Sequence, residues 1–585
     1  MSLVTTFDYI VVGAGSSGCA LAHRLTEDGM SRLLLIEAGK DWPPGREPAS
    51  MLDSFPLIAY FTRDFIWPDM RVTFRPRDRA GNAPMRNYEQ ARVVGGGSSI
   101  NGQFANRGAP ADYDEWAQLG AEGWNWDNVL PYFKRLEHDL DMDGPLHGRG
   151  GRIPIRRIFP HLWSGFTNAA VQAFEDNGYR NIWDQNGEWQ DGYFPSTFSN
   201  AFDRRVSSAI GYLDAATRLR PNLEIASEMS VTRLLFEGRR AIGVKARAAN
   251  GETHTFFARE IILTGGALHT PAMLMRAGIG PGTELKRHGI DVVLDRPGVG
   301  DNLNDHPSVG VAAFLERAAR LDPAIRRHIH VSLRYTARTP DAQPGDMFLC
   351  PLNRTAWHAV GHRLCSLMVI LNKPYSRGRV RLTSARPDDE PDVDFNLLSD
   401  ERDMARMVDA VRFIDALYQA PSIKSVARHP FLASYTERVR RMSKYNKVNA
   451  ALTQAASTFL DAPDAVRKSF LRGFIAEGEP LSDLLADEAK LRENLLRVVV
   501  GVWHASGTCR MGRPDDPYAV TDSRGKVIGV EGLRIADCSV IPALPRANTN
   551  IPAIMIGEKM SDLIREDNRG LNYAAGGDTL IEALP

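Results

Sequence analysis

His504 is the residue whose sequence context best suits acid–base chemistry. It follows the apolar stretch Val-Val-Val-Gly-Val-Trp and precedes the glycine-containing loop Ala-Ser-Gly-Thr. A histidine at the end of an apolar strand can face a pocket, and imidazole titrates near neutral pH, as a general base should. This context is compatible with a catalytic base and with a merely buried histidine. Trp503 is likewise expected either to line the pocket or to pack in the core.

Motifs for several other chemistries do not occur in the sequence. We find no HExxH, no GxSxG nucleophile elbow and no paired His/carboxylate metal spacing. The five cysteines are odd in number and none is spaced CxxC, so neither zinc binding nor a disulfide framework is indicated. Hydrolase and metalloenzyme functions have little support, and no metal site is predicted.

A glycine-rich turn near the N-terminus predicts a dinucleotide-binding β-α-β unit. Its parts are an apolar strand over 9–12, the turn glycines Gly13, Gly15 and Gly18, a helix over 19–25, and a second strand over 33–36 that ends on Glu37. Gly13 permits the tight turn, Gly15 lets a pyrophosphate approach the backbone, and Gly18 lets the helix pack on the strand. Glu37 would accept hydrogen bonds from a ribose diol. The motif does not separate NAD from FAD.

Further elements follow from hydrophobic periodicity. A glycine-rich loop over 91–108 has apolar flanks, which suggests that it lies against a bulky ligand. The other predicted elements are a small antiparallel sheet within 221–248, a buried strand ending at Gly265-Gly266 and a following helix, strands over 365–371, 378–383, 527–530 and 533–536, and helices over 403–418, 481–500 and 551–564.

Charge is balanced overall but not locally. The 585 residues include 71 Lys+Arg and 71 Asp+Glu, which argues against a nucleic-acid partner. The segment 424–472, however, contains ten basic and three acidic residues, so its net charge is +7. This segment is compatible with a solvated helical surface, a peripheral membrane contact or an oligomer interface.

The cellular setting is predicted from what the sequence lacks. No basic start and apolar h-region precede the first strand, and no apolar run reaches the ~18–20 residues that cross a bilayer. Reduced thiols fit the cytoplasm best. We therefore expect a soluble, cytoplasmic protein.

Taken together, the motifs resemble the glucose–methanol–choline family of FAD-dependent oxidoreductases along nearly the whole chain. The matching stretches are VVGAGSSG with IEAG, RVVGGGSSINGQFANRG, GGALHTPAMLMRAGIGP, PGVGDNLNDH, RGRVRLTS, PDVDFNLLSD, WHASGTCRMG and ANTNIPAIMIGEKMSDLI. A closer resemblance, carried by YEQARVVGGGSSIN, PLHGRGG and GVWHASGT, is to members that oxidise aryl and furfuryl alcohols.

The resemblance implies an α/β fold: a Rossmann-like FAD-binding domain with a parallel sheet, and a substrate domain with an antiparallel sheet flanked by helices. The FAD-binding domain is expected to comprise residues 1–160, 200–305 and 495–567. The substrate-binding domain is expected to comprise 161–199 and 306–494, with 424–472 as a basic helical insertion. Residues 568–585 are expected to form a C-terminal tail.

The resemblance also implies the site residues. His504 and Asn548, 44 positions later, match the pair that the family places at the flavin. FAD is expected to be noncovalent, because Ile100 stands where covalently linked members have a histidine. Trp503 and Phe104 are expected in the substrate pocket. The positions expected to hold FAD or surround its flavin end are Gly13, Gly15, Gly18, Glu37, Ala38, Gly95, Gly97, Ser98, Asn101, Val231, Asp537, Thr549 and Pro552.

The implied reaction converts a primary aromatic or furanic alcohol to its aldehyde. His504 would take the hydroxyl proton, Asn548 would hold the oxygen, and hydride would pass to flavin N5, with O2 reduced to H2O2. The open alternatives are a quinone- or carrier-linked dehydrogenase of aliphatic or choline-like alcohols, a pyridoxine-type oxidase and an FAD-containing hydroxynitrile lyase. The length of 424–472 and the residues Gly102-Gln103-Phe104 depart from the pattern and leave the substrate open.

Overall fold

The glycine turn lies in a large, mainly parallel sheet. The computed structural model describes residues 6–577, with side chains described as far as Asn568. Within this part of the chain, seven strands form the sheet: β10 (Leu223–Ala226), β2 (Leu33–Ile36), β1 (Thr6–Val12), β13 (Thr253–Leu263), β12 (Arg240–Ala248) and β11 (Met229–Glu237) in spatial order, with β24 (Leu533–Ile535) paired to β13.

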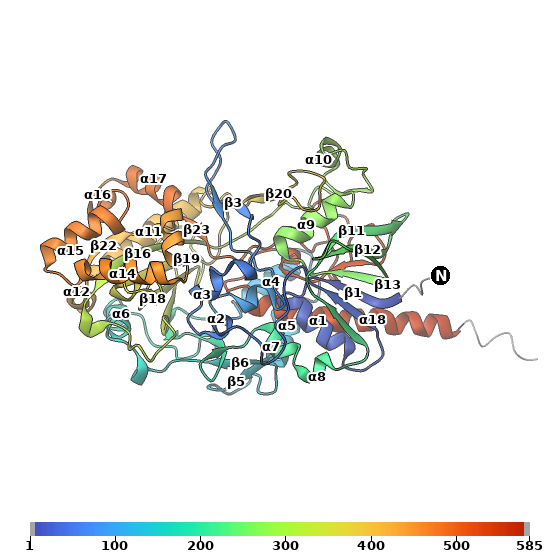
Figure 1. The fold of residues 1–585 in the computed structure, drawn as a ribbon, viewed down its shortest axis with the longest axis horizontal. Helices are drawn as coiled ribbons and strands as arrows, with labels where there is room; N and C mark the ends of the chain where they lie inside the picture. The colour runs from blue at the N-terminus through green and yellow to red at the C-terminus, as the bar shows by residue number, and fades with distance from the viewer. Residues whose placement is uncertain (1–5, 578–585) are drawn as a thin grey trace, which may run out of the picture.

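This sheet confirms the predicted β-α-β unit and the Rossmann-like fold class. β1 runs parallel to β2 and β13, and α1 (Ser16–Thr26) connects the first two. The strands β1 and β2 are nearly continuous apolar runs because both faces of a parallel sheet are covered. Figure 1 shows β1 and β13 beside α1 and α18 (Asn550–Gly577), with the helices of residues 401–498 at the opposite end of the molecule.

The predicted antiparallel sheet within 221–248 forms only in part. β11 and β12 make an antiparallel hairpin that continues onto β13. β10 instead joins the parallel edge of the sheet beside β2. Its four residues pair with the whole of β2, a long-range choice that local periodicity does not reveal.

A second large sheet is antiparallel, as predicted for the substrate side. Of the described residues, seven strands form it: β22 (Ala427–Leu432), β16 (Pro307–Leu315), β19 (Leu364–Leu371), β18 (Met347–Leu352), β17 (Val331–Tyr335) and β7 (Gly192–Pro195) in spatial order, with β23 (Val500–Gly501) paired to β16. The helices α11 (Glu401–Gln419) and α6 (Gly165–Asp176) pack on it. β7 thus shares a sheet with strands from 306–494, and β23, from the segment 495–567, joins the same sheet.

Smaller elements complete the described part of the chain. The short strands are β3 (Arg71–Thr73), β4 (Met85–Asn87), β5 (Glu137–Asp139), β6 (Ile153–Arg156), β8 (Phe198–Ala201), β9 (Arg204–Arg205), β14 (Ile279–Gly280), β15 (Leu294–Asp295), β20 (Arg379–Arg381) and β21 (Asp392–Asp394). The helices include α2 (Ala49–Leu52), α3 (Leu57–Tyr60), α4 (Pro110–Gln118), α5 (Trp126–Leu136), α7 (Ser208–Tyr212), α8 (Ala215–Arg218), α9 (Gly266–Arg276) and α10 (Gly282–Arg287). None of the helices in this part combines the length and the apolar character needed to span a bilayer.

The segment 424–472 is not helical throughout, contrary to the prediction. It opens with the end of α12 (Pro421–Val426) and then forms β22, which pairs antiparallel with β16. Cross-strand pairing with an apolar partner overrides the local charge pattern here. The helices α13 (Glu437–Ser443), α14 (Lys447–Leu460) and α15 (Asp464–Phe470) follow, and then the π-helical turn η6 (Leu471–Ile475).

Three other sequence expectations need correction. The predicted helix over 481–500 breaks into α16 (Leu481–Ala486) and α17 (Glu488–Val498), because Asp487 caps the second helix by accepting from the Lys490 amide. The predicted strand over 527–530 is absent from the described structure, which has only isolated bridges there. Helix α18 also continues past 568 to Gly577, while ion pairs fix Asp567 to Arg534 and Lys526. The rest of the predicted tail, 578–585, lies outside the described residues.

Candidate active site

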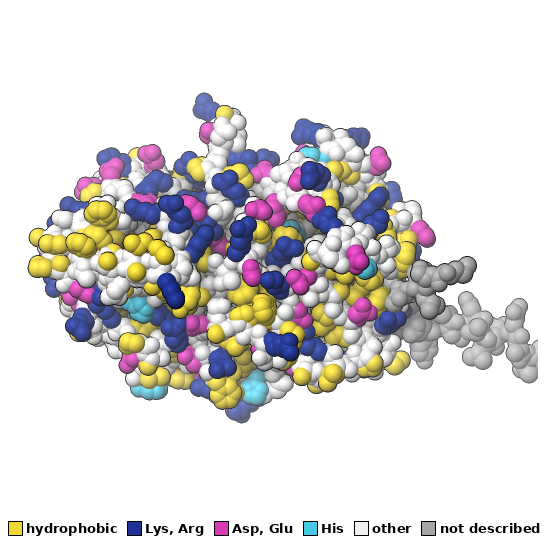
Figure 2. Space-filling view, in the orientation of Figure 1, with side chains coloured by type: hydrophobic (Ala, Val, Ile, Leu, Met, Phe, Trp, Pro, Cys, Tyr) yellow, Lys and Arg dark blue, Asp and Glu magenta, His cyan; other side chains and the backbone are white. Residues whose placement is uncertain are grey.

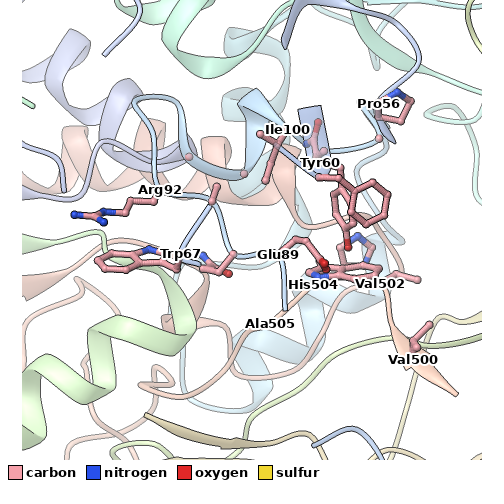
Figure 3. A pocket seen from close by; sticks show the side chains of 18 of the residues that line it. Pro56, Tyr60, Trp67, Glu89, Arg92, Ile100, Val500, Val502, His504 and Ala505 are labelled. Carbon is pink, nitrogen blue, oxygen red and sulfur yellow. The ribbon is translucent and has the colours of Figure 1, made fainter. Parts of the chain in front are cut away.

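A cavity of about 1310 Å³ is lined by residues from both large sheets. It is larger than the roughly 300–1,000 Å³ typical of small-ligand pockets, so it has room for a dinucleotide and a substrate. Figure 3 shows Trp67 and Arg92 toward one side of this cavity and Tyr60 and His504 toward the other.

One end of the cavity is built to hold a dinucleotide. A Cβ on Gly13 would lie 2.5 Å from the Thr264 carbonyl oxygen, and one on Gly18 would lie 2.1 Å from the Gly13 oxygen, so both glycines are needed for packing. A Cβ on Gly15, in contrast, would lie 3.7 Å from the Thr264 carbonyl oxygen, its nearest contact among the described residues. Gly15 lines the cavity and leaves space for a ligand to approach the backbone.

The same end offers backbone donors and a carboxylate. Gly15 caps α1, and no side chain among the described residues bonds to the N–H groups of its first turn, which remain available to phosphate oxygens. The Glu37 carboxylate accepts from the Ala14 amide at 3.0 Å and from the Gly39 amide at 2.8 Å. Burial raises the pKa of Glu37. Ala38 and Val231 also line this end, so the residues present fit the ADP half of FAD.

The second glycine-rich loop packs directly on the first. A Cβ on Gly96 would meet the Gly15 Cα at 2.7 Å, so the short helix η2 (Gly96–Ser99) lies against the dinucleotide turn. Gly97, Asn101 and Phe104 line the cavity. This close packing supports the expectation that the loop lies beside a bulky ligand.

Four predicted cofactor residues do not line the cavity but shape its walls. Gly18 packs α1 on β1, as described above. Gly95 adopts a left-handed φ of 93°, Ser98 accepts from the Ser208 amide at 2.9 Å, and Pro552 lies in the first turn of α18. These residues position the loop and helix rather than face the cavity.

His504 and Asn548 meet in the cavity wall. Their Nε2 and Nδ2 atoms are 3.0 Å apart, and Asn548 is itself fixed by a 3.1 Å bond from its amide to Asn106 Oδ1. Thr549 and Asp537 line the cavity nearby. Asp537 accepts from the Gly266 amide at 2.8 Å and from Thr270 Oγ1 at 2.7 Å, which anchors the start of α9.

A second histidine sets the tautomer of the first. His306 Nε2 is 3.1 Å from the Pro545 carbonyl oxygen, which only accepts, so this nitrogen carries a hydrogen. Burial lowers the pKa of His306 to about 4, which leaves Nδ1 with a lone pair. His504 Nδ1 lies 2.7 Å away and must donate to it. The other ring nitrogen of His504, Nε2, is therefore unprotonated. Its lone pair accepts a hydrogen bond from the Asn548 side-chain amide.

Burial keeps this base unprotonated. The pKa of His504 is lowered well below its ordinary value by desolvation and, to a smaller extent, by the neighbouring His306. A lone pair at Nε2 of a neutral imidazole, next to an amide donor, can accept a proton from a bound hydroxyl group.

Asp305 organises the backbone around both histidines. Its Oδ1 accepts from the His306 amide at 2.8 Å and from the His504 amide at 2.9 Å. Burial raises the pKa of Asp305 to about 7, although the backbone amides oppose the shift. A Cβ on Gly501 would lie 2.1 Å from Asp305 Oδ2, so only glycine allows this approach. Trp503 lies between Gly501 and His504 in the sequence and has a backbone φ of 61°. This is a strained conformation of the kind found at functional sites.

Aromatic rings form the wall next to His504. The Trp503 ring lies edge-on to Tyr60 at 4.9 Å between centroids and stacks near Tyr88 at 5.8 Å, and Tyr435 adds a third edge at 5.9 Å. Phe104 packs on Phe198 and lines the cavity farther along. Such a wall suits a flat, apolar substrate.

Glu89 is a buried carboxylate in the same wall. It lines the cavity, and its Oε1 accepts from Arg440 Nε at 2.7 Å. Burial raises the pKa of Glu89, and Arg440 opposes the shift. This ion pair ties α13 of the basic segment to the active-site wall.

Sequence reasoning did not assign His306, Asp305, Glu89 or Arg440 to the site. The stretch PGVGDNLNDH contains Asp305 and His306, but His306 is 198 residues from His504 and nothing local links them. The sequence signal that could have been used is the adjacent pair Asp305-His306, which directly precedes an apolar strand.

A buried histidine–carboxylate cluster also lies elsewhere in the described residues. His147 Nδ1 is 3.0 Å from Glu137 and its Nε2 is 2.7 Å from Asp184. Burial alone would lower the pKa of His147, but the hydrogen bonds that it donates to its carboxylate partners raise it to about 10. Both ring nitrogens therefore donate, and Arg107 and Arg157 balance the remaining charge. The cluster forms an ion-pair network among the described residues.

Comparison with known proteins gives similarity over almost the full length. Family models described as GMC oxidoreductase match residues 7–308 and 374–557. The 5-(hydroxymethyl)furfural oxidase of Methylovorus sp. is 44% identical over 96% of this chain and 99% of that protein. The oxygen-dependent choline dehydrogenase of Brucella anthropi is 30% identical over 95% of each. The crystal structure of pyridoxine 4-oxidase from Mesorbium loti superposes with a TM-score of 0.78 at 25% identity, over 96% of this chain and 99% of that one.

Proposed function

The chain belongs to the GMC oxidoreductase family, and on that premise we propose that it oxidises primary aromatic or furanic alcohols to aldehydes with O2 as the electron acceptor. As a family member it is an FAD-dependent alcohol oxidoreductase. The choice of alcohol, the use of O2 and the noncovalent binding of FAD are the proposal.

The observation that carries the proposal is the unprotonated His504 Nε2, whose lone pair lies 3.0 Å from Asn548 Nδ2. The Asn548 Nδ2 hydrogens orient the alcohol oxygen, and Nε2 takes the hydroxyl proton. When bound, FAD supplies the hydride acceptor. His306 then stabilises the protonated His504, because the Nδ1 hydrogen already points at an acceptor.

The residues of this chain fit FAD without a covalent bond. Gly15, the start of α1 and Glu37 would hold the ADP half, and Gly97 and Asn101 would lie beside the flavin end. Ile100 lines the cavity with an aliphatic side chain, which has no atom that could bond to the cofactor.

The aromatic walls provide a surface on which a flat, neutral ring can pack. Trp503, Tyr60 and Tyr435 supply flat apolar surface. Glu89 is already paired with Arg440, so it does not offer an uncompensated negative charge to a choline-like substrate. The 44% identity to an oxidase of a furanic alcohol points the same way.

We further propose the two-domain division given by the sequence and a cytoplasmic location. The two large sheets support the first. Support for the second is that all five cysteines are free thiols.

The test is anaerobic mixing of the FAD-loaded enzyme with furfuryl or benzyl alcohol, followed by oxygen. Bleaching of the yellow protein and rapid reoxidation with stoichiometric peroxide are expected. His504→Ala should slow bleaching by at least ~10²-fold. Slow reoxidation that a quinone accelerates would instead identify a carrier-linked dehydrogenase. Cyanohydrin cleavage without bleaching by any alcohol would identify a lyase.

A further inference from the structure

The basic segment exposes a continuous apolar surface. Tyr445, just before α14, Val448, Leu452 and Phe459 on α14, Val466 on α15 and Phe474 on η6 are each between 45% and 67% exposed; we call these six residues the α14 face. Val448, Leu452 and Phe459 follow the spacing that places side chains on one side of a helix. Figure 2 shows hydrophobic side chains gathered at this end of the molecule, over α14 and α15.

Stacked rings join the parts of the α14 face. Phe459 stacks on Phe470 at 5.1 Å between centroids, and Phe470 stacks on Phe474 at 5.2 Å. The stacked rings therefore connect the apolar side chains of α14 to those of η6.

The charges of the segment 424–472 that make no ion pair have one sign. The acidic residues of 424–472 are all engaged: Glu437 pairs with Arg440, Asp461 with Arg320 and Arg363, and Asp464 with His429 and Arg467. The exposed cations Lys444, Lys447, Lys468 and Arg472, in contrast, make no ion pair within the described residues. They flank the α14 face in sequence at both of its ends.

The α14 face borders the active-site cavity. Leu452 and Phe474 belong to both, and Thr453, Phe470 and Ile475 continue the cavity wall inward. Anything that covers the α14 face therefore lies at the cavity entrance.

We propose that the α14 face docks on an anionic lipid surface, so that the active-site cavity opens toward the bilayer. Exposed apolar side chains flanked by unpaired cations are the pattern of an interfacial helix, with the apolar groups among acyl chains and the cations at anionic headgroups. A lipophilic alcohol dissolved in the bilayer would then reach the cavity without crossing water.

A second copy of the chain is a poorer occupant of this face. A twofold contact would bring the same surface of each subunit together and set its unpaired cations opposite like charges. It would also cover the cavity rim on both subunits. An anionic membrane compensates the cations.

The test is cosedimentation of the FAD-loaded enzyme with vesicles of phosphatidylcholine plus phosphatidylglycerol, and with vesicles of phosphatidylcholine alone. Binding to the mixed vesicles and much weaker binding to the neutral ones are expected.

Removing two cations in K444Q/K447Q should weaken vesicle binding about 30-fold. V448S/F459S, which alters two exposed residues outside the cavity wall, should also weaken it. Lys286→Gln and Leu219→Ser, exposed on other parts of the molecule, are the matched controls and should bind like the unaltered enzyme.

Vesicle binding is independent of substrate turnover, so this result and the test of alcohol oxidation can fail separately. Failure to sediment with the mixed vesicles would overturn the proposal. So would a concentration-dependent dimer, detected by analytical ultracentrifugation, that V448S/F459S dissociates, because the α14 face would then belong to a second copy. Equal loss of binding in the control variants would also overturn it.

Discussion

His306 Nδ1 lies 2.7 Å from His504 Nδ1, and this single contact decides which nitrogen of His504 can act as a base. The proton on His306 Nε2 is fixed by the Pro545 carbonyl, so the proton between the two rings belongs to His504. His306 is thus a positioning residue that acts through His504.

Replacing His306 should therefore test the tautomer directly. His306→Gln keeps a donor for Pro545 but lacks an acceptor near the Nδ1 position, whereas His306→Asn places a carbonyl oxygen there. We expect His306→Gln to slow alcohol oxidation by about 10–100-fold, the range found when a group that orients an active-site residue is lost. His306→Asn should recover much of that rate. The measurement is the anaerobic reduction rate at equal FAD content, and equal rates for the two variants would rule out the tautomer role.

The pH dependence of the enzyme should reflect the lowered pKa of His504. Its ordinary value is 6.5, and burial lowers it well below that. Because the base acts in its neutral form, activity is present above the lowered pKa and is lost as pH falls through it. The acid limb of a kcat/KM profile is expected clearly below pH 6.5. A limb at or above 6.5 would show that His504 is solvated and charged more readily than the structure indicates.

Gly15 and Gly13 should respond differently to the same change. Gly15 has extended backbone and its added Cβ meets no close protein atom, so Gly15→Ala should fold normally. It should nevertheless lose FAD, because the methyl group occupies the space left for the phosphates. Gly13 has a φ of 110° and its Cβ would strike Thr264, so Gly13→Ala should destabilise the protein itself.

The FAD-to-protein ratio and the thermal unfolding midpoint of the apoprotein separate these two effects. Full FAD content in Gly15→Ala would mean that the open side of this turn is not the phosphate site. A destabilised Gly15→Ala apoprotein would mean that the turn has less room than the structure shows.

Breaking the ion pair between Arg440 and Glu89 should lower the free energy of unfolding. The Glu89 side chain is 0% exposed, so Arg440→Met leaves a buried carboxylate without its partner. A loss of about 3–5 kcal/mol in the free energy of unfolding is expected. The double variant E89Q/R440M should regain much of it, because no buried charge remains. Denaturant unfolding measures both, with the exposed Arg441→Met as the control; similar values for Arg440→Met and Arg441→Met would contradict the assignment.

Local sequence patterns determined the parts of this protein whose contacts are local. The strand–turn–helix around Gly13 to Gly18 appears where it was predicted, because apolar periodicity and glycine spacing act within a few residues. His504 was singled out for the same reason, since an apolar stretch and a loop meet at that position.

Only the tertiary structure decided the arrangements between distant segments. β22 lies in the segment 424–472 that was expected to be helical, yet its residues pair with the distant strand β16. Arg440 meets Glu89 across 351 residues and His306 meets His504 across 198, and no sequence spacing encodes either contact. These hydrogen bonds and ion pairs form because the packing of two sheets brings the segments together and removes water from them. The sequence by itself therefore points to His504 as a candidate, whereas the fold selects the nitrogen of this residue that can accept a proton.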